Sequence, residues 1–421
     1  MQHFLSFIND LNSLIKVPSV KGEKTESAPF GENIERAFSV YKSIAERLGF
    51  TVINHNGYAL EVAIGDGEEI GIIGHLDVVP SGTGWETDPF TLTEKDGIYY
   101  GRGLCDDKAP MLICLYALKQ LKDSGIPFNR KIRLIVGGDE ESSWQDAKYL
   151  KENANLPVYG FSPDGNFPVS YAEKGMAVIK IKIPKLKNFT DIKGGTVVNA
   201  VCGYASAKPN FVVNEKELKE FGLTFNNGII ESVGKSAHGS QQQLGKNALL
   251  PLFKYFLSKG EKVEKVLDYL FYDKVGLCKL NSEEGFITLS PDIIYESENE
   301  IELLCDCRFP HPFTLDTVKE KLNQFGLDYE ISLKHDTLFV EKDSPLVRAL
   351  LSAYNSVLGT NGKPISQGGS TFARVFEKGV AFGPEFVGKS NFIHEPNERI
   401  SKEDLIKLYD IYYTAILNLI K

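Results

Sequence analysis

The sequence predicts an α/β protein in which a mostly parallel sheet with flanking helices is interrupted by an inserted α+β domain. Three observations support this class. Over residues 1–175, apolar runs of strand length alternate with segments of helical periodicity. Over residues 176–340, strand-like and helix-like segments occur without regular alternation. Over residues 341–421, the alternation returns. Alternating strands and helices favour a parallel sheet covered by helices. We therefore expect one domain made of residues 1–175 and 341–421, with residues 176–340 inserted as a second domain.

The elements of the first part follow from the spacing of its apolar residues. Helical spacing predicts helices at Gln2–Ile15, Asn33–Leu48 and Met111–Lys122. Short apolar runs predict strands at Thr51–Asn54, Ala59–Ile64, Ile70–His75 and Ile132–Gly137. Ligands of α/β sheets gather at the carboxyl ends of the strands. Two of the runs lead to candidates of this kind, His75 and the pair Glu140–Glu141.

The inserted part and the last part are interpreted in the same way. Strands are expected at Ala177–Ile183, Gly228–Val233 and Ile301–Cys307, and helices at Lys246–Lys259, Lys262–Phe271 and Thr317–Phe325. Beyond Ser344 we expect a helix at Leu346–Leu358, an apolar strand at Gly379–Phe382 and a final helix at Lys402–Ile420. This last run returns to the rhythm of the first part, so we assign both to the same domain.

Composition limits the classes of partner. The chain has 421 residues, of which 42% are hydrophobic, so it can bury the cores of two or three domains. Its formal net charge of −9 argues against nucleic acid or an anionic membrane surface as the main partner, since both need a basic field. The start of the chain does not resemble a signal peptide, and no run approaches the ~20 apolar residues of a membrane span. Six scattered cysteines without C-x-x-C spacing fit a reducing cytoplasm.

The strongest single signal is the end of the run Ile70–His75, which continues to Asp77. Residues two apart on a strand point to the same side, so the side chains of His75 and Asp77 can meet in one site. An imidazole with a carboxylate beside it suits a metal ligand together with the group that orients it. The pair therefore predicts one half of a metal site.

Four further clusters of acidic residues or histidine follow along the chain. They contain Asp106–Asp107, Glu140–Glu141, Asp164 and His394, the last after the strand-like residues 391–393. Each has an ordinary alternative, because Asp often caps a helix, an acidic loop is often solvated, and Pro-Asp-Gly often forms a turn. Adjacent carboxylates repel one another unless a cation lies among them. The joint presence of the clusters therefore favours a two-metal hydrolase.

The order of these motifs resembles a known family. His-x-Asp, Gly-Arg-Gly-x-x-Asp-Asp-Lys, Asp-Glu-Glu, Pro-Asp-Gly and a late His, spanning Gly74 to Glu398, resemble the M20 family of two-metal peptidases. Within M20, Asp106–Lys108, Gly368–Arg374 and Gly383–Pro384 are most similar to the bacterial dipeptidases of the PepV and Sapep kind, relatives of carnosinase. Ala109 and Ser370 stand where Gly is usual, which affects fine geometry more than metal binding.

The resemblance implies two divalent metal ions per chain and their ligands. One ion would be bound by His75 and Asp164, the other by Glu141 and His394, and Asp106 would bridge both. Mixed His and carboxylate ligands suit Zn²⁺, and also Mn²⁺ or Co²⁺. A carboxylate bridge holds two such ions about 3.5–4 Å apart, and a water between them loses proton affinity.

The resemblance also assigns catalytic roles. Asp77 would hold the His75 ring, and Glu140 would act as general base and then as general acid. The inserted domain would be a lid, whose His238 polarises the scissile carbonyl.

In the resemblance, four more residues would lie near the oxyanion or the C-terminal carboxylate of the substrate. They are Asn199, Arg308, Gly369 and Ser370. Arg suits a planar carboxylate through paired hydrogen bonds. Their ordinary alternatives are a turn residue for Asn199 and a surface strand residue for Arg308, and His238 could be a plain loop histidine.

The function implied by the resemblance is that of a cytoplasmic metallodipeptidase, which hydrolyses short peptides with a free C-terminal carboxylate by a metal-bridged water and the general base Glu140. An M20-type N-acyl-amino-acid amidohydrolase, acting as a deacylase or desuccinylase, is the main alternative. A non-catalytic binding protein on the same scaffold is the minor one, since fold does not determine function. We expect a monomer in preference to a homodimer, which stays open.

Overall fold

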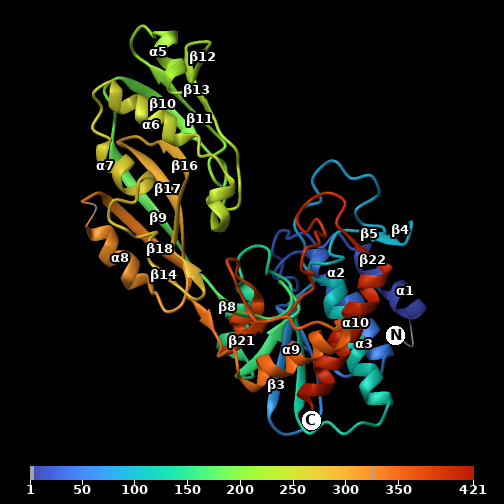
Figure 1. Ribbon diagram of the computed structural model, residues 1–421. Helices are drawn as coiled ribbons and strands as arrows, with labels where there is room; N and C mark the ends of the chain where they lie inside the picture. Colours follow the sequence, from blue (N-terminus) through green and yellow to red (C-terminus); the bar gives the residue numbers. More distant parts are fainter. Residues whose placement is uncertain (1–3, 325) are drawn as a thin grey trace. The chain divides into compact units, whose positions relative to one another are not determined.

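The computed structural model describes residues 4–324 and 326–421, and the chain divides into two compact units (Figure 1). The first unit runs to Tyr171 and continues with Phe339–Ile365 and Ser370–Lys421. The second unit contains Ala172–Leu338 and Ser366–Gly369. The boundaries expected after residues 175 and 340 fall near these limits. The assignment of the two units as a catalytic domain and a lid domain stays a prediction.

The first unit is built on a nine-stranded mixed sheet with the order β1-β2-β6-β3-β7-β21-β8-β19, and β20 pairs with β8. Its strands are β1 (Val52–Asn54), β2 (Ala59–Ile64), β3 (Glu69–His75), β6 (Lys131–Gly137), β7 (Tyr159–Ser162), β8 (Ser170–Glu173), β19 (Leu338–Phe339), β20 (Ile365–Gln367) and β21 (Lys378–Ala381). The pairs β3–β6, β3–β7 and β7–β21 are parallel and lie in the centre, between antiparallel pairs. The predicted α/β class with flanking helices is confirmed, and the sheet is mixed.

Helices cover this sheet because its central strands are apolar on both sides. They are α1 (Phe4–Ile15), α2 (Glu32–Arg47), α3 (Lys108–Asp123), α4 (Gln145–Asn153), α9 (Pro345–Leu358) and α10 (Lys402–Leu419), with a short 3₁₀ turn η3 (Phe372–Val375). Helix α3 is buried at every position from Lys108 to Leu118 and packs against α1, α10 and β3. Its burial makes the loop that precedes it, residues 101–107, part of the interior.

A small three-stranded sheet lies beside this core, with the order β22-β5-β4. Its strands are β4 (Thr93–Lys95), β5 (Ile98–Tyr100) and β22 (Arg399–Ser401). Strands β5 and β22 are antiparallel, and Tyr100 is opposite Arg399. The chain that leaves β5 therefore runs beside the chain that enters β22, although some 300 residues separate them along the sequence.

The second unit is an antiparallel eight-stranded sheet with helices on one face, as the core cluster shows (Figure 1). Its strands, in spatial order, are β12 (Thr224–Asn226), β13 (Ile229–Val233), β11 (Tyr204–Pro209), β10 (Phe189–Gly194), β16 (Thr288–Glu296), β17 (Glu300–Phe309), β9 (Gly175–Pro184) and β18 (Asp328–His335). Its helices are α5 (Glu215–Glu220), α6 (Leu249–Ser258), α7 (Glu264–Val266) and α8 (Leu315–Asn323), with the short turns η1 (Gly239–Leu244) and η2 (Leu267–Phe271). Strands β14 (Asn281–Ser282) and β15 (Gly285–Phe286) form a small hairpin.

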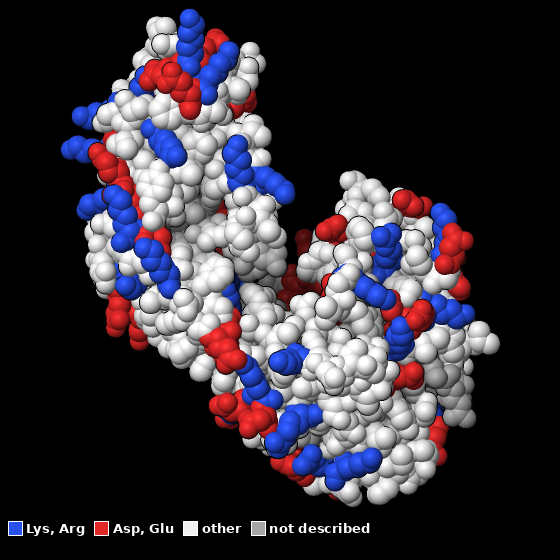
Figure 2. Space-filling view, viewed as in Figure 1, with Lys and Arg blue, Asp and Glu red and all other residues white. Residues whose placement is uncertain are grey.

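The open face of this sheet carries paired charges. Along β9, residues alternate between buried and half-buried, as expected for a strand with one face on the core. Lys180 lies 2.9 Å from Glu302, and Lys182 lies 2.7 Å from Glu330. Figure 2 shows acidic and basic residues interspersed over the drawn face of this unit. The polar positions of β9 are thus occupied by cross-strand ion pairs.

Most predicted elements agree with the structure to within a few residues, and the exceptions have local causes. Residues 391–393, which are strand-like in sequence, form no strand, because Phe392 adopts a left-handed backbone conformation with φ of 58°, and His394 directly after them has φ of 63°. The helix expected at Lys262–Phe271 is divided into α7 and the π-helical turn η2. Gln2, His3 and Phe325, which the predicted helices include, lie outside the described residues. No helix in the described part of the chain is both long and apolar enough to cross a membrane.

Candidate metal centre

Several candidate residues of the first unit lie at or shortly after the ends of its central strands. Strand β3 ends at His75, β6 ends two residues before Asp139, and β7 ends two residues before Asp164. Because β3 is parallel to both β6 and β7, these three strand ends lie at one edge of the sheet. His75, Asp164 and the acidic loop after β6 therefore lie at the carboxyl ends of these strands, and their role as ligands stays a prediction.

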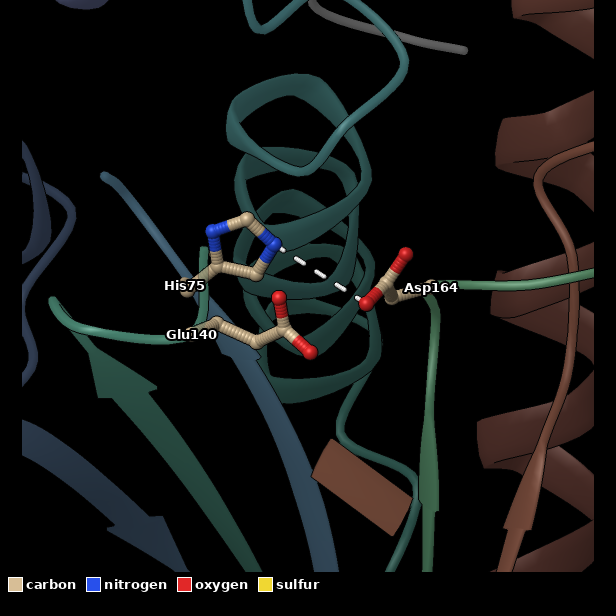
Figure 3. Close-up of side chains that lie close together, drawn as sticks. All are labelled: His75, Glu140 and Asp164. Atoms are coloured by element: carbon tan, nitrogen blue, oxygen red, sulfur yellow. Dashed lines mark ion pairs between the residues drawn. The ribbon is translucent and has the colours of Figure 1, made fainter. Parts of the chain in front are cut away.

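The structure brings six of the predicted residues together in two groups. In the first group, His75, Glu140 and Asp164 offer ligand atoms that all lie within 4.8 Å of one another. Figure 3 shows the three side chains converging, with His75 Nε2 3.8 Å from Asp164 Oδ2. The second group, with the same spacing, consists of Asp106, Glu141 and His394.

Asp106 contacts both groups. Its Oδ1 lies 3.0 Å from His75 Nε2, and its Oδ2 lies 2.9 Å from His394 Nε2. His394 Nε2 is also 2.9 Å from Glu141 Oε1. The two oxygens of one carboxylate thus face one imidazole each, which is the arrangement expected of a bridging ligand.

Asp77 connects the His75 ring to the acidic loop. His75 Nδ1 lies 3.2 Å from Asp77 Oδ1 and 3.0 Å from the Asp77 carbonyl oxygen. The same carboxylate accepts hydrogen bonds from the backbone N–H groups of Glu140, at 3.3 Å, and Glu141, at 3.0 Å. A ring that donates from Nδ1 presents its Nε2 lone pair to the site. Asp77 therefore orients the imidazole and the two glutamates at once.

The charge balance of this cluster fits a cation. Burial, and then the charge of Asp164, raise the pKa of Glu140 well above its ordinary range. Burial, and then the charge of Asp106, raise the pKa of Asp164 to about 8. Four carboxylates and two imidazoles share the site, so without a cation some carboxylates must take up protons. His75 Nε2 and Asp106 Oδ1 are buried 3.0 Å from each other, and apart from this contact neither has a hydrogen-bond partner among the described residues.

Two neighbours of Asp106 have positions that the sequence did not reveal. Asp107 occupies the N-cap position of α3, yet its side chain makes no capping bond and instead accepts from the His75 backbone N–H at 3.3 Å. A side chain at Gly74 would collide with Asp107 Oδ2, since a Cβ there would lie 1.9 Å from it. Lys108 is fully buried and donates to the carbonyl oxygens of Leu14, at 3.0 Å, and Val17, at 2.7 Å. The plain helix-cap interpretation of this motif is therefore wrong.

The predicted substrate residues of the second unit also lie together. The Gly239 backbone N–H donates to the Asn199 carbonyl oxygen at 2.7 Å, and Ala200 forms a β-bridge with His238. Gly239 packs against Asp306, since a Cβ there would lie 2.4 Å from Asp306 Oδ2. Asn199, His238 and Asp306 therefore belong to one region of this unit.

Arg308 adjoins this region and is not a surface residue. It is 4% exposed, and its Nε lies 2.9 Å from Asp306 Oδ2. Its Nη1 donates to the Gly368 carbonyl oxygen at 3.1 Å, and Gly369 and Ser370 follow directly along the chain. Ser370 Oγ is buried and has no hydrogen-bond partner among the described residues. Asp306 was missed by sequence reasoning, although its position two residues before Arg308 on one strand was a usable signal.

Comparison with known proteins agrees with this geometry. The family model described as peptidase family M20/M25/M40 matches residues 71–418. The protein named "Putative dipeptidase YtjP" from Bacillus subtilis (strain 168) is 31% identical over 452 residues, which cover 98% of this chain and 97% of that protein.

Two solved structures share the fold. Human carnosine dipeptidase 1 has a TM-score of 0.62 at 16% identity, covering 100% of this chain and 97% of that one. The M20 family metallo-carboxypeptidase Sso-CP2 from Sulfolobus solfataricus has a TM-score of 0.60 at 18% identity, covering 98% and 99%. The predicted resemblance is confirmed: this chain belongs to peptidase family M20/M25/M40 and is a hydrolase.

Proposed function

We propose that this protein is a metal-dependent dipeptidase that cleaves short peptides with a free C-terminal carboxylate. The observation that carries the proposal is the position of Asp106 between two groups of ligand atoms, with Glu140 beside them. The similarity over nearly the whole chain to the protein named "Putative dipeptidase YtjP" supports the choice of substrate class. Fold alone would not, because one fold serves many reactions.

Two divalent cations per chain fit the donor set. His75 and Asp164 would hold one ion, Glu141 and His394 the other, and Asp106 would be shared. Imidazole and carboxylate donors favour Zn²⁺, with Mn²⁺ and Co²⁺ as alternatives. When bound, such ions polarise a carbonyl oxygen and lower the pKa of a water between them.

Glu140 is the proposed general base and acid. Its side chain lies in the group of His75 and Asp164 and is half-buried, so it can reach a water held at this edge of the sheet. It would take a proton from the attacking water and then pass it to the leaving amine. Glu141 points to His394 instead, which separates the residue that moves protons from the one that holds an ion.

The second unit would recognise the substrate. Arg308 donates from Nε to Asp306 and from Nη1 to the Gly368 carbonyl oxygen, whereas its Nη2 has no partner in the described part of the chain. This nitrogen would bind the C-terminal carboxylate, as guanidinium groups commonly do. His238 would donate to the developing oxyanion, with Asn199 beside it, and Gly369 and Ser370 would line the carboxylate side.

We also propose a cytoplasmic location and a monomer, with a homodimer as the alternative. None of the six cysteines, all within the described ranges, forms a disulfide. Free thiols are typical of a reducing compartment. The partner is a small peptide, so neither nucleic acid nor a membrane is needed for the proposed reaction.

Metal analysis combined with a substrate panel tests the proposal. We expect about two divalent ions per chain and faster hydrolysis of free dipeptides than of N-acetyl or N-succinyl amino acids. Faster turnover of the acylated amino acids would instead identify a deacylase. Bound metal without turnover of either class would identify a binding protein.

A further inference from the structure

Glu398 is a buried carboxylate that no part of the proposed mechanism uses. Its side chain is 0% exposed, and it lies four residues after His394. A buried carboxylate is costly unless hydrogen bonds or an opposite charge compensate for it. Its partners should therefore reveal what holds it in place.

All its partners belong to the loop that carries Asp106. Glu398 Oε1 accepts from the backbone N–H groups of Cys105, at 2.7 Å, and Asp106, at 3.3 Å. Glu398 Oε2 accepts from the Gly103 N–H at 3.0 Å and from Arg102 Nη1 at 2.9 Å. Three of the four bonds go to the backbone, so the carboxylate determines the path of the loop as well as pairing one charge.

The backbone adds to this connection. The Gly101 N–H donates to the Glu398 carbonyl oxygen at 3.1 Å, and the antiparallel pair β5–β22 begins directly beyond, with Tyr100 opposite Arg399. Asp106 follows Gly101 on one of these two chain segments, and His394 precedes Glu398 on the other. Their side chains meet again at 2.9 Å.

We propose that Glu398 is a positioning residue that holds the Asp106 loop and the His394 turn in the register needed for both to reach the cations. The inference rests on the proposed metal centre and adds a residue that binds no metal. If Glu398 only stabilised the fold, its ion pair with Arg102 would suffice. A positioning role depends instead on its hydrogen bonds to the backbone of Cys105 and Asp106.

The substitution Glu398→Gln separates these roles. An amide keeps the size of the side chain but turns one acceptor into a donor, which then faces backbone N–H groups. We expect the zinc affinity of the purified protein to fall by roughly 10–100-fold, the range for losing a group that orients metal ligands. The readout is competition for Zn²⁺ with a chromophoric chelator, which requires no turnover.

Glu61→Gln is the matched control. Glu61 is also a buried glutamate of the first unit, 3% exposed, and its side chain bonds Arg133, at 2.6 Å, and His55, neither of which lies in a ligand loop. Both variants should unfold at lower temperature than the wild type in the metal-free state. Only Glu398→Gln should lose zinc affinity, while Glu61→Gln should stay within about twofold of the wild type because no ligand-orienting bond is lost.

A third variant, Glu398→Asp, keeps the charge with a side chain one carbon shorter. Because the shorter side chain moves the carboxylate away from the Asp106 loop, Glu398→Asp should bind zinc more weakly than the wild type but more tightly than Glu398→Gln, and it remains informative should Glu398→Gln fail to fold. Wild-type zinc affinity in a folded Glu398→Gln or Glu398→Asp protein overturns the positioning role. Absence of zinc binding in the wild type would instead overturn the proposed function itself.

Discussion

The cluster around Glu140 in the first unit and the pair Asp306–Arg308 in the second bury charged side chains in opposite ways. In the first unit, burial raises the pKa of Glu140, and the charges of Asp164, Glu141 and Asp106 raise it further, whereas His75 partly counteracts them. In the second unit, burial raises the pKa of Asp306, and the adjacent Arg308 counteracts it. The first cluster therefore needs a charge from outside the chain, whereas the second supplies its own counterion. This difference supports the proposal that the first cluster binds cations.

The largest effect is expected for a substitution in the acidic cluster around Glu140. Glu140→Gln removes the proton-transfer group but no proposed ligand, so turnover should fall by ~10²–10⁴ because general acid–base catalysis is lost. Steady-state kinetics and metal analysis of the same preparation check this, and the metal content should stay at the wild-type level. Near-normal turnover would show that another residue moves the proton.

His238→Ala asks whether the second unit takes part in the reaction. Loss of one oxyanion donor should lower kcat by ~10²–10³. Metal content should be unchanged, because His238 belongs to neither ligand group. Glu141→Gln is the contrasting variant, since a neutral amide is a poorer ligand and one ion should then be lost. An unchanged rate in His238→Ala would confine the chemistry to the first unit.

A smaller effect is expected from the ion pair Asp306–Arg308 of the second unit. C-terminally amidated dipeptides should be poorer substrates by about 10–100-fold in kcat/KM, because one charge-assisted contact worth ~1.5–3 kcal/mol is lost. Arg308→Lys should reduce this discrimination, since a point charge cannot reproduce the planar contact. Equal rates for free and amidated peptides in the wild type would argue against a pocket that binds the carboxylate.

The smallest effect is a pH dependence of stability in the metal-free protein. The pKa of Asp164 is raised to about 8, so the folded state binds more protons than the unfolded state between about pH 4 and pH 8. Stability should therefore decrease as the pH rises through this window, and urea unfolding in the presence of a chelator measures it. Zn²⁺ should remove most of the dependence, because bound cations favour the ionised carboxylates. A stability that increases with pH under chelation would contradict the charge balance inferred here.

Local patterns in the sequence were sufficient for much of the fold. Strand periodicity predicted β3 and its end at His75, and helical spacing predicted the buried α3. The same patterns missed β16, because its nine residues include a bulge between Pro291 and Ile293. They also made residues 391–393 look like a strand, since apolar residues occur in turns as well. Such patterns report periodicity, and irregular backbone has none.

The sequence by itself determined which residues could carry the chemistry and their order along the chain, from His75 to His394. Only the tertiary structure decided which of them meet. Asp106 reaches two imidazoles because the loop before α3 is bound to Glu398, whose bond to Cys105 joins residues 293 positions apart. Contacts over such separations depend on strand register and on the burial of whole helices. No local spacing encodes them, and for the same reason Asp306, Lys108 and Glu398 gained their roles only in the folded chain.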